Sequence, residues 1–460
     1  MAGSELCGGF SSFFARVGTF TADGNGNITG GLEDVNLCTG VESLQFTGGT
    51  YTISPNGRGN VRLTNSSGTT NYRVTISSAT QGFILQADAS ATASGSFQRQ
   101  NTAAFSNPAI QGGYVFDFNG VDVVAGISNS ASIIGRFDAS GGGGISSGVF
   151  DSNIGGTLSG QQPFPAGAFY QIDPNSDGAT FGRATANIAG HNFVFYVADA
   201  THMKFLGTDF PSALVGDAFA QQNISINIAS LSGSFAFLIG GSSSNGPIAT
   251  AGRFTANGAG NITNVVLEEN NSGAITLLPN GTVTGSYTVD ANQLGGGTLT
   301  WTDTNAGTFS FIFYLVSPSQ AVLQETDSSI VSDGTFSAQT TIPISAAGLA
   351  GNFAFVWSGV SSAEEDFVGQ LALTAASTNN FTGIMDFNEF GTGQLFFNVP
   401  INGSLTLNGD GTQANAYTVN SQTTPANTFN FTAYIIDQTT VLLVGVDNNR
   451  VIAGTLARQP

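Results

Sequence analysis

The sequence has almost no positive charge. Lys204 is the only lysine among 11 basic residues in a chain of 460, and the formal net charge is −19. A protein that binds nucleic acid needs a basic surface along the phosphate backbone, so we expect no nucleic-acid partner. No apolar run approaches the roughly 18 residues of a membrane-spanning helix, so we also expect no transmembrane helix.

Histidine is scarce as well, with only His191 and His202 in the chain. A zinc site at these residues would need carboxylates such as Asp199 to complete it, and two ordinary surface histidines are the favoured interpretation. An enzyme needs a convergent acid, base or metal site. The sequence therefore predicts no enzyme, no catalytic residue, no bound metal and no cofactor.

Glycine (62 residues) and phenylalanine (37 residues) are abundant, whereas only 9% of the residues are charged. Aromatic side chains suit the pleated surface of a sheet, and glycine suits turns that need a positive φ. The phenylalanines also supply the apolar surface that disordered chains lack. This composition predicts a folded, all-β chain.

A glycine followed two residues later by a large apolar side chain recurs every 117 residues, which predicts tandem copies of one module. We call these the repeat glycines: Gly18, Gly135, Gly252 and Gly369. Each copy also ends shortly after a glutamine. We place the four modules at residues 1–100, 101–222, 223–339 and 340–460.

Within each module, alternating apolar and polar residues are bounded by Gly, Asn and Asp, which is typical of strands and hairpins. A module has room for roughly eight short antiparallel strands. A small up-and-down β-barrel is the favoured fold because closure removes exposed strand edges, and a β-sandwich is the alternative. Short connectors such as residues 340–347 predict modules arranged as beads on a string.

The later modules open with a strand that begins 18 to 22 residues before the repeat glycine, for example at Gly113, Gly233 and Gly351. In the first module those residues would precede Met1, so we expect this module to lack its opening strand. Either the true start lies upstream, together with an export signal, or the strand is borrowed from elsewhere. The upstream start is favoured because the first residues lack the features of a signal peptide.

Two turn sequences carry a resemblance. They are residues 20–28 (FTADGNGNI) and 51–59 (YTISPNGRG), with counterparts at residues 254–262 and 287–289 in the third copy. The chain resembles a group of uncharacterised bacterial exported proteins that carry tandem modules with such turns. The fourth copy departs from the pattern, because residues 371–381 lack the glycine-rich turn. The resemblance implies export and repetition and carries no activity.

Two motifs imitate known sites. Residues 21–29 look like the middle of a calcium-binding EF-hand loop, but position 12 of such a loop would be Leu32 and a β-hairpin turn is favoured. Residues 144–148 (GISSG) match a nucleophile elbow, whose repeat counterpart has Thr29 at the serine position. A hairpin strand is therefore favoured there too.

The two cysteines, Cys7 and Cys38, both fall in the first module. If residues 13–23 pair in a hairpin with residues 28–38, the two thiols end near the same edge. A disulfide would then form in an oxidising compartment, and two free thiols are the equal alternative.

Recurring polar residues at strand ends are the remaining candidates for a site. Turn capping is the favoured interpretation, because any module would repeat it in order to fold. The alternative is one ligand or cation site in each module. These residues are Asp34, Asn36, Asp88, Asp151, Asn153, Asp209, Glu268, Asn270, Asp327, Asp386, Asn388 and Asp447.

Low charge, tandem spacing and many Thr, Ser and Asn residues favour a non-enzymatic extracellular or cell-surface protein with a structural or adhesive role. Its partners would be cell-surface or matrix glycans, or other copies of itself. The alternative is that each barrel binds a carbohydrate or a small apolar molecule. An interior filled by phenylalanine would argue against that alternative.

Overall fold

The computed structural model describes residues 1–222, 226–278, 283–290, 294–304, 306–340, 344–375, 379–409, 414–423 and 426–460. Residue 223, the predicted start of the third module, and residues 341–343 and 376–378 of the predicted connector and turn lie outside this part. The all-β prediction is confirmed, since four antiparallel sheets contain most of the described residues. Among the described residues, no helix has both the length and the apolar character needed to cross a membrane.

Each sheet is formed from one stretch of the chain. Module 1 contains β1 (Ala2–Cys7), β2 (Phe10–Ala22), β3 (Asn27–Leu37), β4 (Gly40–Gln45), β5 (Gly48–Ile53), β6 (Arg58–Asn65), β7 (Gly68–Ile76), β8 (Gln81–Asp88) and β9 (Ala91–Gln98). Module 2 contains β10 (Gln111–Val124), β11 (Ile127–Ser140), β12 (Ile145–Ile154), β13 (Thr157–Pro163), β14 (Phe169–Ile172), α1 (Ser176–Phe181), β15 (Arg183–Ile188), β16 (His191–Asp199), β17 (His202–Gly207) and β18 (Ala213–Ala220).

The third and fourth sheets follow the same order of elements. Module 3 contains β19 (Ser232–Ser243), β20 (Gly246–Asn257), β21 (Asn261–Asn271), β22 (Ala274–Leu278), β23 (Thr284–Asp290), β24 (Gly296–Asp303), β25 (Gly307–Ser317), β26 (Gln320–Glu325) and β27 (Ile330–Ala338). Module 4 contains α2 (Ala346–Leu349), β28 (Gly351–Val360), β29 (Glu364–Leu373), β30 (Asn379–Glu389), β31 (Gln394–Thr406), β32 (Asn415–Ser421), β33 (Thr428–Ile435), β34 (Thr440–Gly445) and β35 (Val451–Arg458). Single 3-10 turns span Thr102–Ala104, Asn107–Ala109 and Ile228–Ser230.

The predicted up-and-down barrel is confirmed, and the β-sandwich alternative is not what forms. In module 4, eight consecutive strands close by pairing β28 with β35. In modules 1 and 3, the β2–β3 and β20–β21 pairs complete the circuit, with β4 and β22 as additional strands. In module 2, the sheet runs from β13 to β14, and an isolated bridge joins Gly144, just before β12, to Phe169 of β14.

Aromatic side chains fill the interiors of the barrels. In module 4, the ring centroids of Phe355 and Trp357 lie 4.3 Å apart, and Trp357 also packs on Phe431 at 4.9 Å. Modules 2 and 3 have equivalent clusters around Phe118 and Trp301, which are both fully buried. These interiors are packed with side chains, as expected for an eight-stranded barrel.

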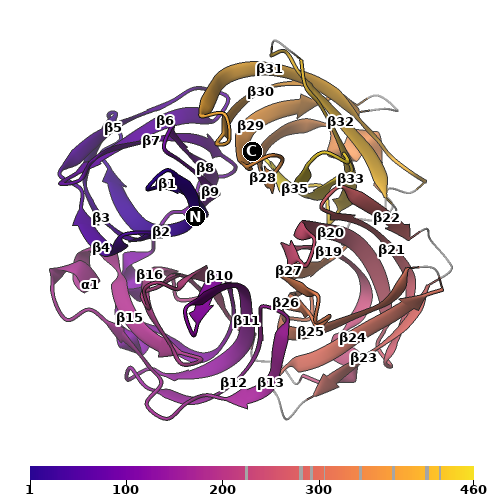
Figure 1. The fold of residues 1–460 in the computed structure, drawn as a ribbon, viewed down its shortest axis with the longest axis horizontal. Coiled ribbons are helices and arrows are strands. Elements are labelled where there is room, and N and C mark those ends of the chain that lie inside the picture. Colours follow the sequence, from indigo (N-terminus) through magenta and orange to yellow (C-terminus); the bar gives the residue numbers. More distant parts are fainter. Residues whose placement is uncertain are drawn as a thin grey trace.

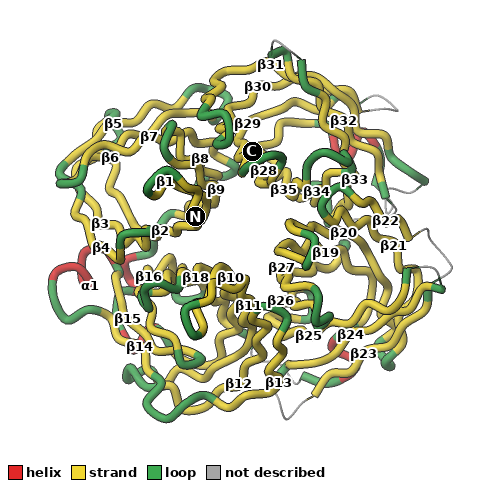
Figure 2. Tube along the Cα trace, viewed as in Figure 1, coloured by secondary structure: helices red, strands yellow, loops and turns green. Residues whose placement is uncertain are grey.

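The beads-on-a-string prediction is wrong. Figures 1 and 2 show the four barrels arranged in a ring, with both chain ends at its inner rim. Module 4 contacts module 1 as well as module 3, because β29 and β30 lie beside β7, β8 and β9. Sequence periodicity identifies equivalent modules but carries no information about the angle between neighbours.

The prediction that module 1 lacks its opening strand also needs correction. β1 pairs with β2 on one side and with β9 on the other, as the opening strands β10, β19 and β28 do in their own barrels. It is six residues long, against 10 to 14 in its counterparts. The second half of the opening strand is therefore present, without the residues that follow Gly113, Gly233 and Gly351 in the first half of the later opening strands.

Candidate functional site: the joints between modules

In each module an acidic residue is followed two positions later by an asparagine, and these acid-x-Asn pairs lie where one barrel meets the next. The pairs are Asp34 with Asn36, Asp151 with Asn153, Glu268 with Asn270, and Asp386 with Asn388. We call these four contact regions the joints, 1–2, 2–3, 3–4 and 4–1. In each joint, the acid and the asparagine project from the third strand of a module (β3, β12, β21 or β30) toward the following module. Recurrence of these residues in the sequence thus reflects recurrence of one contact.

Each joint asparagine donates its side-chain amide hydrogens to backbone carbonyl oxygens of the next module. Asn36 donates to Ser212 at 2.8 Å and to Gly207 at 3.0 Å. Asn153 does the same with Ile330 at 2.7 Å. These asparagines are at most 2% exposed, so water cannot reach their amide groups. The carbonyl oxygens of the next module take the place of water as hydrogen-bond partners.

The joint between module 4 and module 1 repeats this contact. Asn388 donates to the carbonyl oxygens of Ala91, Asp88 and Gln86 at 2.9, 3.1 and 3.2 Å. At joint 3–4, Asn270 donates to three carbonyl oxygens in the matching turn of module 4. The last module is therefore attached to the first by the contact that attaches every other pair.

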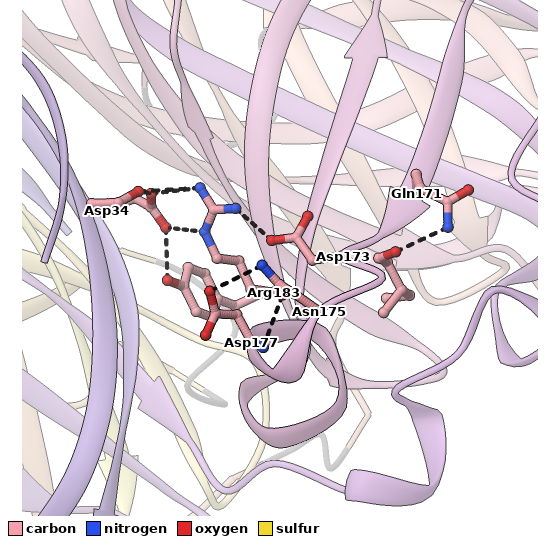
Figure 3. Close-up of polar contacts among 9 residues, drawn as sticks. Asp34, Gln171, Asp173, Asn175, Asp177 and Arg183 are labelled. Carbon is pink, nitrogen blue, oxygen red and sulfur yellow. Dashed lines mark hydrogen bonds and ion pairs between the residues drawn. The ribbon is translucent and has the colours of Figure 1, made fainter. Parts of the chain in front are cut away.

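The acid of joint 1–2 is held by two side chains of module 2. Both oxygens of Asp34 accept hydrogen bonds from the Arg183 guanidinium, each at 2.8 Å, and Tyr196 donates its hydroxyl at 2.7 Å. Figure 3 shows this bidentate pair and the second carboxylate, Asp173, on the far side of the guanidinium. Asp34 is 1% exposed, so its charge is compensated almost entirely by these partners.

The other three acids have a simpler environment. Tyr314 donates its hydroxyl to Asp151 at 2.5 Å, and Tyr434 donates to Glu268. At joint 4–1, Arg58 takes this place and pairs with Asp386. Arg183 is the first residue of β15 and Arg58 is the first residue of β6, and these strands hold the same place in the strand order of their barrels.

The joints therefore differ in charge. Arginine neutralises the acid at joints 1–2 and 4–1, whereas at joints 2–3 and 3–4 the side chain that crosses the joint to the acid is an uncharged tyrosine. Desolvation by burial raises the pKa of Asp151, and it raises the pKa of Glu268 to about 7, in each case against the lowering effect of the tyrosine hydrogen bond. Glu268 is therefore partly protonated at neutral pH.

The other recurring aspartates hold turns within their own module. Asp209 accepts from the backbone N–H and side-chain amide of Asn192, both at 2.7 Å, and Asp447 accepts from Asn430 in the same way. Asp88 accepts from Asn71 at 2.9 Å, and Asp327 accepts from the N–H of residue 329. These contacts are of the turn-capping kind, and they position the carbonyls that receive the joint asparagines.

A glutamine also recurs at every joint, and it is not among the site residues predicted from the sequence. The amide of Gln100 donates to the Val197 carbonyl at 2.8 Å. Gln221, Gln339 and Gln459 donate to the equivalent carbonyl of their own following module. The glutamine near each module end is also a repeat marker in the sequence, which is the signal that could have identified this contact. In module 2 the marker is Gln222, and its neighbour Gln221 makes the contact.

The motifs that imitate catalytic or metal sites lie in hairpins. Asp23 accepts from the backbone N–H groups of Asn25 and Asn27 in the β2–β3 turn, at 2.7 and 3.0 Å. Ser146 lies on β12 and donates to a backbone carbonyl of β11. Among the described residues, no group of three or more His, Cys, Asp and Glu side chains is arranged to hold a metal ion.

The histidines are less exposed than the surface interpretation implies. His202 lies at joint 1–2 with Nδ1 2.6 Å from Gln98 and Nε2 2.6 Å from Asp217. Lys204 donates to the same Asp217 carboxylate at 2.8 Å. His191 lies 3.9 Å from Asp209. Each histidine thus lies beside an aspartate of its own module.

Cys7 and Cys38 form a disulfide, with their Cα atoms 6.2 Å apart. The bond joins the end of β1 to the turn after β3. The free-thiol alternative therefore does not hold, and the hairpin between β2 and β3 that would bring the thiols together is present.

A polar cavity of about 500 Å³ lies where modules 2 and 3 meet. Arg136 and Asp138 of β11 line it together with Gln221, and Leu294 of module 3 covers one side. A smaller cavity of about 280 Å³ lies beside Asp151 in the same joint. Guanidinium, carboxylate and amide groups of this kind suit a hydroxylated ligand.

No family model and no curated protein matches this chain. Among solved structures, a de novo designed fluorescence-activating β-barrel aligns with 16% identity over 25% of this chain and 99% of its own, at a TM-score of 0.20. A transferrin binding protein B mutant from Haemophilus parasuis Hp5 aligns with 10% identity over 84% of this chain and 82% of its own, at a TM-score of 0.21. At these TM-scores, neither similarity assigns a function.

Proposed function

We propose that the protein is a non-enzymatic extracellular or cell-surface repeat protein with a structural or adhesive role. The observation that carries this proposal is the ring itself, in which one asparagine-to-carbonyl contact recurs at all four joints. Repeated contacts of this kind favour a rigid platform that presents its outer loops at fixed positions. The aromatic filling of barrels 2 to 4 argues against a ligand chamber inside them.

The location outside the cell is supported by the disulfide and by the resemblance to exported proteins. Structural disulfides persist in oxidising compartments and are rare in the cytosol. Cell-surface or matrix glycans, or other copies of the chain, are the partners we propose.

Ligand binding is the second candidate, and the polar cavity between modules 2 and 3 favours it. Its arginine, aspartate and glutamine side chains would bind a carbohydrate in preference to an apolar molecule. In this version the ligand lies at a joint and not within a barrel.

The two functions are separated by a binding screen of the whole chain. Beads coated with the protein are tested on a surface-glycan array, with and without calcium, and the soluble protein is tested by thermal shift against mono- and disaccharides. The structural or adhesive proposal expects retention on glycan surfaces or self-association, with no saturable shift from small sugars. A saturable shift that Arg136→Ala removes would favour the cavity, and turnover of any substrate would contradict both.

A further inference from the structure

Arg136 has one unused donor nitrogen in the polar cavity at joint 2–3. This side chain lies on β11 and is only 6% exposed. Its Nε donates to Gln221 at 3.0 Å, and its Nη1 donates to Asp138. Its Nη2 donates to no acceptor among the described residues. The guanidinium lines a cavity of about 500 Å³, so Nη2 is the nitrogen left to bond with solvent or with a ligand there.

In module 3, the equivalent arginine has this nitrogen bonded by the protein. Arg253 holds the same place after its repeat glycine, and its Nη2 donates to Ser234 at 3.1 Å and to Thr255 at 3.3 Å. Ser234 pairs with Thr255 in the ladder of module 3. In module 2, the same pair is Gly113 and Asp138. Module 2 therefore lacks the hydroxyl group that would bind Nη2.

Gly113 also keeps space beside the unused nitrogen. A Cβ atom at this position would lie 2.5 Å from Nη2 of Arg136. The backbone of Gly113 does not have a positive φ, so the conformation of the chain does not require glycine here. Absence of a side chain at residue 113 thus removes a hydrogen-bond partner and leaves the donor accessible at once.

Asp138 supplies an acceptor beside this donor. Its Oδ2 accepts from Arg136 and, at 2.5 Å, from Ser147, whereas its Oδ1 accepts from no side chain among the described residues. Burial acts to raise the pKa of Asp138, but the hydrogen bonds from Arg136 and Ser147 and the charge of the arginine lower it below its ordinary value. The group is therefore a carboxylate at neutral pH, and the ion pair offers one donor and one acceptor to a ligand.

We propose that this cavity binds a neutral saccharide through two adjacent hydroxyl groups, one accepting from Nη2 of Arg136 and the other donating to Oδ1 of Asp138. The proposal rests on the ligand-binding candidate given above and adds to it the recognising atoms and the class of ligand. A hydroxyl group both donates and accepts, so a pair of neighbouring hydroxyls satisfies both protein groups together.

An acidic ligand fits this site less well. Asp138 already compensates the charge of Arg136, so a second carboxylate would lie beside Oδ1 without a counter-charge of its own. The formal charge of −19 on the whole chain also repels anions at longer range. The electrostatics of the cavity therefore favour an uncharged sugar over a uronic acid.

The remaining walls of the cavity suit a sugar ring. Ile226 and Leu294 supply apolar surface for its C–H groups. Gln111 and Gln222 also line the cavity and are exposed, so their amide groups are available to further hydroxyls. The volume of about 500 Å³ lies within the range of roughly 300–1,000 Å³ that is typical of small-molecule sites.

The test measures binding of saccharides to the full chain by isothermal titration calorimetry. The neutral probes are methyl glucoside, methyl galactoside, cellobiose and maltose, and the acidic probes are glucuronic acid and galacturonic acid. We expect saturable binding of at least one neutral probe, with one ligand per chain. Both acids should bind at least tenfold more weakly than that probe.

Gly113→Ser is the decisive variant, because the new hydroxyl would accept from Nη2 as Ser234 does in module 3 while Arg136 stays in place. It should weaken saccharide binding at least tenfold. Gly142→Ser is the matched control, since this exposed glycine of the same module has only Ser140 near an added Cβ, at 3.6 Å. The control should bind like the parent, and circular dichroism verifies the fold of both variants.

Asp138→Asn tests the same site through its charge, even if Gly113→Ser fails to fold. The variant leaves Arg136 without its counter-charge, so the preference for neutral over acidic probes should fall at least tenfold. Acids that bind the parent as tightly as neutral sugars do, or a folded Gly113→Ser variant that binds like the parent, would overturn the proposal. If Arg136→Ala still abolished binding in that case, the ligand-binding candidate would stand. Absence of binding by every neutral probe would overturn both and leave the structural or adhesive role.

Discussion

The joint asparagines are buried side chains that serve another module's backbone. Removing such an amide leaves carbonyl oxygens without a donor and out of reach of water, which costs more than the bonds themselves contribute. The same side chain also fills space between two barrels. A single asparagine is therefore expected to have a large effect on the stability of its joint.

We predict that Asn270→Ala lowers the free energy of unfolding of modules 3 and 4 by about 2 kcal/mol, because three carbonyl oxygens lose their donor. Fluorescence during urea unfolding measures the change, since Trp301 and Trp357 are buried in these two modules. The exposed Asn245→Ala is the matched control, expected within about 0.5 kcal/mol of the unmodified chain. Equal effects of both substitutions would contradict the role of the joint asparagine.

Glu268 gives joint 3–4 a dependence on pH. Its pKa is about 7 in the folded protein and near 4.5 in an unfolded chain. Between these values the folded state holds a proton that the unfolded state has released. Stability from this group is therefore complete below pH 4.5 and is lost as the pH rises through 7.

We predict that Glu268→Gln flattens this dependence, because the amide imitates the protonated acid and can still accept from Tyr434. At pH 8 the variant should be more stable than the unmodified chain by up to about 3 kcal/mol, and at pH 4.5 the two should be close. Urea unfolding at the two pH values provides the measurement. Asp34→Asn is the contrasting variant, expected to destabilise because Arg183 would lose its bidentate partner. A variant as pH-dependent as the parent would refute the assignment.

The sequence identified the joint residues by recurrence but could not identify their partners. Asn36 and the carbonyl it binds are 171 positions apart, and Asn388 lies 302 positions from Gln86. No local pattern links such positions, and turn capping predicts the same recurrence. The strand-end aspartates make turn contacts of the kind that interpretation describes, whereas the acid-x-Asn pairs needed the position of a neighbouring module.

At the scale of the element, the repeat glycines illustrate how one residue fixes the packing of two strands. In modules 2 to 4, each lies against a phenylalanine ring of the opening strand beside it, where the two strands approach closely. Period-two alternation was enough to predict the hairpins and the barrel. It was not enough to detect β1, whose residues carry no aromatic alternation, and only its pairing with β2 and β9 identifies it.

We predict that Gly252→Ala destabilises module 3 by about 1–3 kcal/mol, because the added methyl group meets the Phe237 ring as well as the neighbouring backbone. Gly18→Ala meets a similar stretch of backbone without a ring, so its cost in module 1 should be clearly smaller. Hydrogen exchange of β20 and β2 measures the two local stabilities. Equal costs would show that the ring is not what demands glycine.

The ring of the whole molecule is closed at joint 4–1, where the last module meets the first. β29 and β30 of module 4 contact β7, β8 and β9 of module 1, and the Arg58–Asp386 pair lies within that contact. Tandem repetition is compatible with an open array or a closed one. The choice rests on the angle between neighbouring barrels, which is why the sequence left it undetermined.

We predict that Asn388→Asp opens the ring at joint 4–1 while the four barrels stay folded. The new carboxylate would face the carbonyl oxygens of Gln86, Asp88 and Ala91 with no donor between them, a buried unpaired charge that costs about 3–5 kcal/mol. Small-angle X-ray scattering should show a larger radius of gyration at pH 8, with unchanged circular dichroism. Asn245→Asp serves as the control and should leave the scattering curve unchanged. A compact Asn388→Asp variant would mean that joint 4–1 does not depend on this contact.

The equivalence of the four joints has a consequence for chain connectivity. Because module 4 holds module 1 by the contact that links consecutive modules, the fold does not depend on where the polypeptide is cut. A circular permutant that begins at module 2 or module 3, with a linker across the inner rim from residue 460 to residue 1, should assemble the same four-barrel ring.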